Sequence, residues 1–156
     1  MKNFLFLLST ILIINCSSNV PVVNLQKAEF ETMTFDVVEK NLVVQQNLPD
    51  HVQILIAHWF DQKVLINGFD GDMTFNITKY SQEVSSVSDG KRVDLTLSFI
   101  VFLNKPSLSQ TKLIEGDVSS YGILTGNFSL AEFDTTIQNT QTDLIVRLSR
   151  DLQSKI

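Results

Sequence analysis

The sequence predicts an α+β protein, in which a four-stranded, mainly antiparallel sheet carries two helices on one face in the order β-α-β-β-β-α. Two long segments, residues 50–67 and the last 28 residues, repeat apolar side chains at the period of a helix. The segments before and between them alternate apolar and polar residues, as half-buried strands do. A chain of 156 residues without internal repeats suits one core, so we expect a single domain over residues 25–156.

The first strand is predicted over residues 25–34, where charged and uncharged side chains alternate. Residues 35–46 are apolar but irregular, and they give no clear assignment. A helix is predicted over residues 50–67, with Asp50 as its N-cap and Gly68 as the residue that stops it. Its apolar positions are Val52, Leu55, Ile56, Trp59, Phe60 and Ile66.

Three further strands are predicted in the middle of the chain. The first alternates from Met73 and extends toward Val87, and Asp89-Gly90 then indicates a tight hairpin turn. The clearest strand covers residues 93–103, although Ile100 and Phe102 interrupt its polar side near the end. A weaker strand over residues 113–124 ends at Gly126.

The last element is a long helix that begins at a capping box. Ser129 and Glu132 have the spacing at which each side chain satisfies a free backbone amide of the other residue. The helix continues to the C-terminus with one apolar stripe, formed by Phe133, Ile137, Leu144, Ile145, Leu148, Leu152 and Ile156. Such a stripe should pack on the sheet.

Residues 1–15 have the composition of a secretory signal peptide. Lys2 precedes an apolar run from Phe4 to Ile14. As a helix that run would reach only about 16 Å, roughly half of the hydrocarbon core of a bilayer. A buried or amphipathic helix is the alternative, but the run has no polar face. We therefore expect residues 1–15 to be removed.

The motif Ile13-Ile14-Asn15-Cys16 resembles the lipobox of bacterial lipoproteins, with Asn15 in place of the usual small residue. The resemblance implies a diacylglycerol on the sulfur of Cys16, a further acyl chain such as palmitate, and a lipidated tether over residues 16–24. Ser17 after the cysteine implies the outer membrane rather than the inner membrane. Lipidation would also occupy the single cysteine of the chain, which would otherwise be unpaired in an oxidising compartment.

The sequence offers no catalytic, metal or cofactor site. His51 and His58 lie seven residues apart on the predicted helix, which is not the spacing of a helical zinc site. The Asp70-Gly71-Asp72 loop lacks the glycine and glutamate of a calcium-binding EF-hand. No nucleophile motif or glycine-rich phosphate loop is present. We therefore expect a protein that is not an enzyme and that needs no cofactor.

The net charge of −5 and the scattered basic residues argue against nucleic acid as a partner and against a polybasic membrane anchor. Trp59-Phe60 is expected in the core, and a patch open to lipid or to a partner is the alternative. Because the basic residues form no polybasic anchor, membrane attachment is expected to be covalent, through Cys16.

The segment from Arg92 to Leu103, the run Tyr121-Gly122-Ile123-Leu124 and the long terminal helix resemble the C-terminal half of small envelope lipoproteins. These are the LptE-like lipopolysaccharide-assembly lipoproteins and the auxiliary lipoproteins of ABC-type transport systems. LptE-like chains usually have Gly and an aromatic residue after the cysteine, where this chain has Ser17-Ser18-Asn19.

The resemblance implies a non-catalytic docking or assembly component, lipid-anchored in the bacterial envelope and facing the periplasm, with an envelope protein as partner. The alternative is a binder or carrier of a small amphiphile, using Trp59, Phe60 and the apolar end of the strand over residues 93–103.

Overall fold

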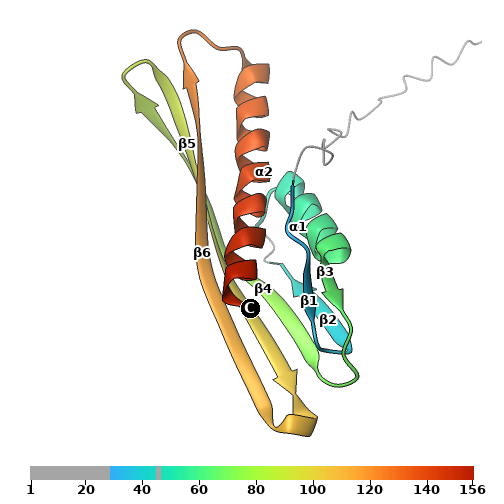
Figure 1. Cartoon of the computed structure of the whole chain (residues 1–156). Coiled ribbons are helices and arrows are strands. Elements are labelled where there is room, and N and C mark those ends of the chain that lie inside the picture. The colour runs from blue at the N-terminus through green and yellow to red at the C-terminus, as the bar shows by residue number, and fades with distance from the viewer. Residues whose placement is uncertain (1–28, 45–46) are drawn as a thin grey trace, which may run out of the picture.

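Three long antiparallel strands dominate the computed structural model, which describes residues 29–44 and 47–156 (Figure 1). Strands β4 (Asp72–Val87), β5 (Gly90–Lys105) and β6 (Gln110–Thr125) contain 16 residues each and follow one another as a meander. The short strand β2 (Glu39–Val43) pairs in parallel with β4, which gives the order β2-β4-β5-β6. The predicted four-stranded, mainly antiparallel sheet is confirmed.

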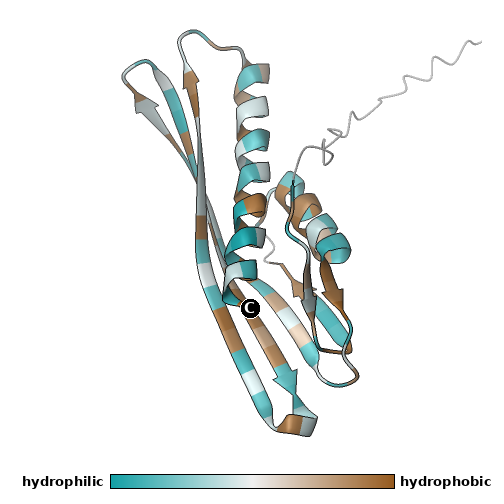
Figure 2. Cartoon of the chain, in the orientation of Figure 1, coloured by the Kyte–Doolittle hydropathy of each residue, from teal (hydrophilic) through white to brown (hydrophobic). Residues whose placement is uncertain are grey.

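Both helices lie on one face of this sheet (Figure 1). Helix α1 covers Asp50–Lys63 and helix α2 covers Leu130–Lys155. The capping box of α2 is confirmed: the Glu132 amide donates to Ser129 Oγ at 3.2 Å, and the Ser129 amide donates to Glu132 Oε2 at 2.7 Å. Apolar residues recur along both helices, and Figure 2 shows them as brown bands. The predicted arrangement of two helices on one face is therefore correct.

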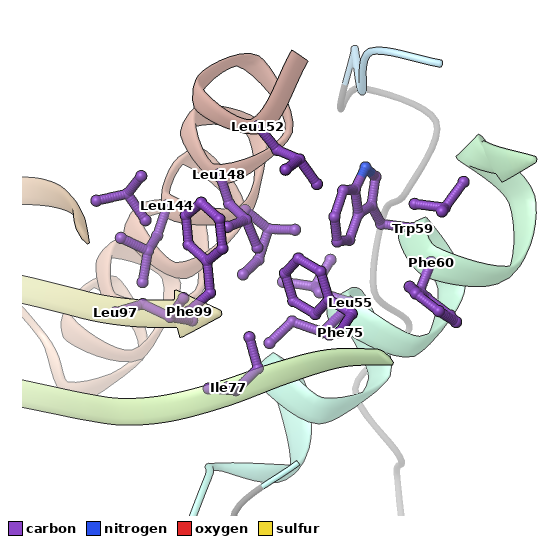
Figure 3. Packing of buried hydrophobic residues seen from close by; sticks show 14 of the residues in the cluster. Leu55, Trp59, Phe60, Phe75, Ile77, Leu97, Phe99, Leu144, Leu148 and Leu152 are labelled. Atoms are coloured by element: carbon purple, nitrogen blue, oxygen red, sulfur yellow. The ribbon is translucent and has the colours of Figure 1, made fainter. Parts of the chain in front are cut away.

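The core lies between the helices and the sheet (Figure 3). Alternate residues of the strands point into it, and the ring of Phe75 on β4 stacks on the ring of Phe99 on β5 at a centroid distance of 5.5 Å. Helix α1 contributes Trp59, whose ring meets Phe75 edge-on at 5.4 Å. The stripe of α2 is buried from Leu144 to Leu152, whereas Phe133 and Ile137 are partly buried. All these side chains form one hydrophobic cluster.

The first strand of the main sheet differs from the prediction. Within the predicted segment 25–34, of which residues 25–28 lie outside the described part, only Met33 and Thr34 are in a strand. They belong to β1 (Met33–Phe35), which pairs in parallel with β3 (Val64–Ile66) in a small second sheet. The fourth strand of the main sheet is β2 instead, within the segment that the sequence left unassigned. The described element order is therefore β-β-α-β-β-β-β-α.

The first helix begins at the predicted residue, Asp50, but its predicted N-cap and its predicted end are wrong. Pro49 is the N-cap and makes no side-chain capping bond, so Asp50 lies in the first turn. The helix ends at Lys63 because Val64–Ile66 pairs with β1. Gly68 is needed for a close approach of two backbones, since its amide donates to the Val37 oxygen at 3.0 Å and a Cβ there would lie 2.4 Å from the Val37 nitrogen.

The turns at the ends of the long strands and the last residue of the chain also differ from the prediction in detail. The β4–β5 turn has Ser88 and Asp89 at its centre, and Gly90 follows with φ of 144°. The β5–β6 connection contains a short 3₁₀ helix, η2 (Pro106–Leu108). Ile156, predicted in the buried stripe, is 48% exposed because it lies beyond the last turn of α2. In the described part of the chain, neither helix is long and apolar enough to cross a membrane.

Candidate docking surface

Several large side chains are solvent-exposed on the face of the sheet opposite the helices. Side chains of successive residues point to opposite faces of a strand, so one face of β5 and β6 is buried and the other faces outward. No described helix lies over this outer face (Figure 1). An open antiparallel face is usually polar. Here exposed apolar side chains interrupt that pattern, and those on β5 and β6 form two groups.

The first group, the Phe102 cluster, consists of Ile100, Phe102 and Leu113. Phe102 lies directly opposite Leu113 in the β5–β6 register, and the two side chains are 45% and 52% exposed. Ile100 lies two residues before Phe102 on the same face and is half-buried. Facing apolar pairs across two strands stabilise a sheet. Phe102 and Leu113 nevertheless leave about half of their apolar surface exposed, and a partner could cover it.

The second group, the Tyr121 cluster, consists of Arg92, Asp94, Tyr121 and Ile123. The guanidinium of Arg92 donates to Asp94 at 2.6 and 2.8 Å and lies 4.6 Å from the centre of the Tyr121 ring. These hydrogen bonds hold the pKa of Asp94 below its ordinary value. Tyr121 and Ile123 are 57% and 51% exposed. Arginine and tyrosine dominate binding energy at many protein interfaces, and here the arginine is already held in place.

A polar zone separates the two clusters. Ser81 and Thr96 share a hydrogen bond of 2.6 Å, and Ser98 donates to Asp117 at 2.5 Å. Glu115 and Asp117 are both exposed on β6. From Leu113 to Tyr121 the strand extends about 27 Å. Two apolar groups on an open sheet face, separated by a polar zone, do not form the concave, mostly apolar pocket that is typical of small-molecule sites.

His51 and His58 lie apart from this surface, on α1. His58 is exposed, whereas burial lowers the pKa of His51, which lies beside Gln138 of α2. Within the ranges 29–44 and 47–156, no group of three His, Cys, Asp or Glu side chains could hold a metal ion. Cys16 and the whole segment 1–24 lie outside the described residues.

The two carboxylates of Asp70-Gly71-Asp72 bond to residues at and just beyond the end of β5. Asp70 accepts a hydrogen bond of 3.0 Å from the Ser107 amide, and Asp72 accepts one of 3.1 Å from the Asn104 side chain. Hydrogen bonds from the Ser107 side chain and amide lower the pKa of Asp70. Asp70 thus holds the connection between β5 and β6, whereas Asp72 pairs with Asn104 across β4 and β5.

Trp59 and Phe60 belong to the core, which was the favoured interpretation of the sequence. Their exposed fractions are 0% and 6%, so neither can line an open amphiphile site. The interrupted polar pattern at Ile100 and Phe102 was visible in the sequence. The Tyr121 cluster was not, because its contacts depend on the register between β5 and β6.

No family model and no curated protein matches the chain. The described fold is shared with a rare lipoprotein B. That crystal structure, from Shewanella oneidensis, matches with a TM-score of 0.51 and 11% identity over 76% of this chain and 96% of that one.

Two further lipoprotein structures are similar. A minor lipoprotein from Acinetobacter baumannii has a TM-score of 0.49 and 10% identity, over 77% of this chain and 92% of that one. A lipoprotein B from Nitrosomonas europaea has a TM-score of 0.44 and 11% identity, over 81% and 88%. The predicted resemblance to small envelope lipoproteins is confirmed at the level of the fold.

Proposed function

We propose that this protein is a lipid-anchored, non-catalytic lipoprotein of the bacterial envelope, whose outer sheet face docks on a partner protein in an assembly or transport complex. The observation that carries the proposal is the pair of exposed clusters on a sheet face that no described helix covers. The shared fold of the rare lipoprotein B supports the class of protein.

The anchor is inferred from the sequence. A short apolar leader followed by a lipobox-like motif would give a mature chain that begins at Cys16 and carries diacylglycerol. Several acyl chains hold a protein at a membrane far more firmly than one. Ser17 favours the outer membrane, with the folded part on the periplasmic side.

Charge favours a different protein over a second copy as the partner. The chain carries a net charge of −5, and Glu115 and Asp117 lie exposed between the two clusters. A partner with apolar side chains at both ends and basic residues between them would complement this face. Two copies would bring like charges together.

The anchor is tested by intact mass. The chain purified from bacterial membranes should lack residues 1–15 and carry the added mass of diacylglycerol on Cys16. The Cys16→Ser chain should show neither change. A Cys16→Ser chain that is still processed and still held at the membrane would overturn the anchor.

Docking is tested with a photo-crosslinking amino acid placed at Tyr121 or Leu113, one in each cluster. Leu65 on β3, 43% exposed, is the matched control position. We expect adducts with one partner from both cluster positions and none from Leu65. The variant Leu113→Asp with Ile123→Asp should remove the partner from detergent extracts while membrane attachment is unchanged and circular dichroism still shows a folded domain, since each lost cross-strand pair costs only about 0.2–1 kcal/mol.

Two results would overturn docking by the outer face. Adducts of twice the mass of the chain would show that a second copy covers the face. Equal adducts from all three positions would show that the contact is not specific to the sheet.

A further inference from the structure

Strand β6 is the last strand of the main sheet, and no described strand lies beyond it (Figure 1). Main-chain groups of successive residues in an antiparallel strand point alternately to its two sides. The Gly126 amide donates to the Asp89 oxygen at 3.1 Å, and the Leu124 oxygen lies close to Gly90 of β5. Even-numbered residues therefore face β5. The odd-numbered residues over 117–123 point their N–H and C=O groups to the open side.

The lower part of this edge is already occupied. Lys155, in the last turn of α2, donates to the carbonyl oxygen of Glu115 at 3.0 Å, and that oxygen is one of the outward groups. Above it, none of the described side chains hydrogen-bonds to the outward main-chain groups over residues 117–123. A further strand could pair with these groups.

The other open edges of the main sheet carry features that keep strands from adding to them. Strand β2 has only five residues. Where β4 extends beyond β2, its register with β5 is irregular between Ile77 and Lys79, and Lys79 and Glu83 add charges. Short length, bulges and charges are the usual protection of edge strands. The segment 117–125 of β6 lacks it, since its register is unbroken, it contains no lysine, arginine or proline, and Asp117 is its one charge.

A groove of about 420 Å³ opens between the upper end of this edge and the first turns of α2. Ile123, Phe128 and Ala131 give it apolar surface, and Ile123 is 51% exposed. The hydroxyls of Thr135 and Thr136 donate to carbonyl oxygens of their own helix at 2.7 and 2.9 Å, so they need no partner from outside. The groove therefore suits an apolar side chain that enters it from a strand lying along β6.

We propose that the partner adds an extended strand to the edge of β6 between Asp117 and Thr125, and that this strand places an apolar side chain in the groove between β6 and α2. In such pairing the main-chain hydrogen bonds give affinity, and the groove selects the side chain. The proposal rests on the proposed function, since the added strand lies beside Tyr121 and Ile123 of the Tyr121 cluster.

The added strand belongs to a different protein. A second copy would pair through its own β6, and the even-numbered side chains of that strand would have to enter the groove. Val118, Ser120 and Leu124 are already buried on the helix face of their own sheet. A second copy therefore has no side chain on β6 to offer.

The test is photo-crosslinking of the full chain in cells, with the crosslinking amino acid at Asp117 or at Ile123, followed by peptide mapping of the adducts. A strand that lies along β6 advances residue by residue with it. The two positions should therefore label sites about six residues apart in a single segment of the partner. A synthetic peptide of that segment should compete, and its binding should slow hydrogen exchange of the main chain at Ser119 and Tyr121.

Two variants test the edge and the groove separately. Ser119→Pro removes one outward N–H, a change that edge strands tolerate. It should lower the adduct yield and the affinity for the peptide about tenfold, whereas Ser119→Ala keeps the N–H and should change neither. Thr135→Trp fills the groove from an exposed position on α2 and should also cost about tenfold, with Asp134→Trp, outside the groove, as its control. Because Thr135→Trp leaves β6 intact, it decides the matter if Ser119→Pro does not fold.

Strand addition is overturned if Asp117 and Ile123 give no adducts or scattered ones, or if folded Ser119→Pro and Thr135→Trp chains bind the peptide as before. Docking by the outer face would survive that result as long as Tyr121 and Leu113 still form adducts with one partner. Loss of those adducts too would overturn docking itself. Adducts of twice the mass of the chain at Asp117 and Ile123 would overturn a different protein as the source of the strand.

Discussion

The ammonium of Lys40 on β2 donates a 2.7 Å hydrogen bond to the carbonyl oxygen of Val64, the residue at which α1 has ended. The same nitrogen donates to the carbonyls of Phe60 and Asp61 at 2.9 and 3.1 Å, and it lies 5.0 Å from the centre of the Phe60 ring. The last carbonyls of a helix lack partners within it and carry partial negative charge. One lysine from a strand therefore closes the end of the helix.

The first prediction follows from this contact. Lys40→Met keeps the aliphatic stem but removes three hydrogen bonds to carbonyls, so we expect the free energy of unfolding to fall by about 1–2 kcal/mol. Urea unfolding monitored by circular dichroism measures the change. Lys79→Met, at an exposed position on β4, is the control and should shift the midpoint little. Equal shifts in both variants would contradict the capping role.

The pairing of β3 with β1 explains why the sequence misplaced the end of α1. Ile66 continues the helical period, but Val64-Leu65-Ile66 is also a short apolar run that suits a strand, and only its pairing with β1 decides between them. Strand β2 was missed for a similar reason. It lies at the edge of the sheet and only half-buries alternate residues, which leaves a weak pattern. Both errors concern contacts between distant segments.

The long strands and α2 could be predicted because their patterns are local. Sixteen residues of alternation identify a strand by themselves. A capping box and a stripe of apolar residues likewise identify α2 without reference to its neighbours. Only part of the candidate surface could be predicted from the sequence. Ile100 and Phe102 break the polar pattern within one strand, whereas Tyr121 meets Arg92 only because β6 takes one particular register on β5.

The second prediction concerns the contact between β6 and α2. A Cβ at Gly122 would lie 2.4 Å from Thr140 Oγ1 and 2.8 Å from Thr136 Cγ2. Gly122→Val should therefore push α2 off the strand and cost about 2 kcal/mol of stability. Ser119→Val, exposed on the other face of β6, is the matched control. Adding Thr140→Ala should restore part of the loss, since it removes the nearest obstructing atom. A loss as small as that of the control would contradict the close contact.

The third prediction is a pH dependence at Asp143 of α2. Burial raises the pKa of Asp143, but hydrogen bonds from Ser120 at 2.6 Å and Arg147 at 2.7 Å outweigh it and hold the pKa below its ordinary value. A lowered folded-state pKa stabilises the fold above the ordinary value, and this contribution is lost as the pH falls through the acid range below about 4.

Asp143→Asn should therefore flatten the loss of stability between about pH 4 and pH 2. Its effect at pH 7 should stay under about 1 kcal/mol, because the Asp143 side chain is 45% exposed and solvent screens the charge. Unfolding midpoints measured across this pH range test it, with Asp134→Asn, exposed on the same helix, as the control. Parallel pH curves for wild type and Asp143→Asn would contradict the prediction.

The last prediction concerns Trp59, whose indole N–H is buried and finds no acceptor among the residues that the structure describes. Trp59→Ala should cost about 3–5 kcal/mol, because it empties the space between α1 and β4. Trp59→Phe should cost under about 1.5 kcal/mol, since it keeps a ring against Phe75 and removes a donor whose burial alone costs about 1–3 kcal/mol. Circular dichroism is the measurement, because Trp59 is the only tryptophan and its fluorescence is lost in both variants. A loss from Trp59→Phe as large as the loss from Trp59→Ala would contradict the prediction.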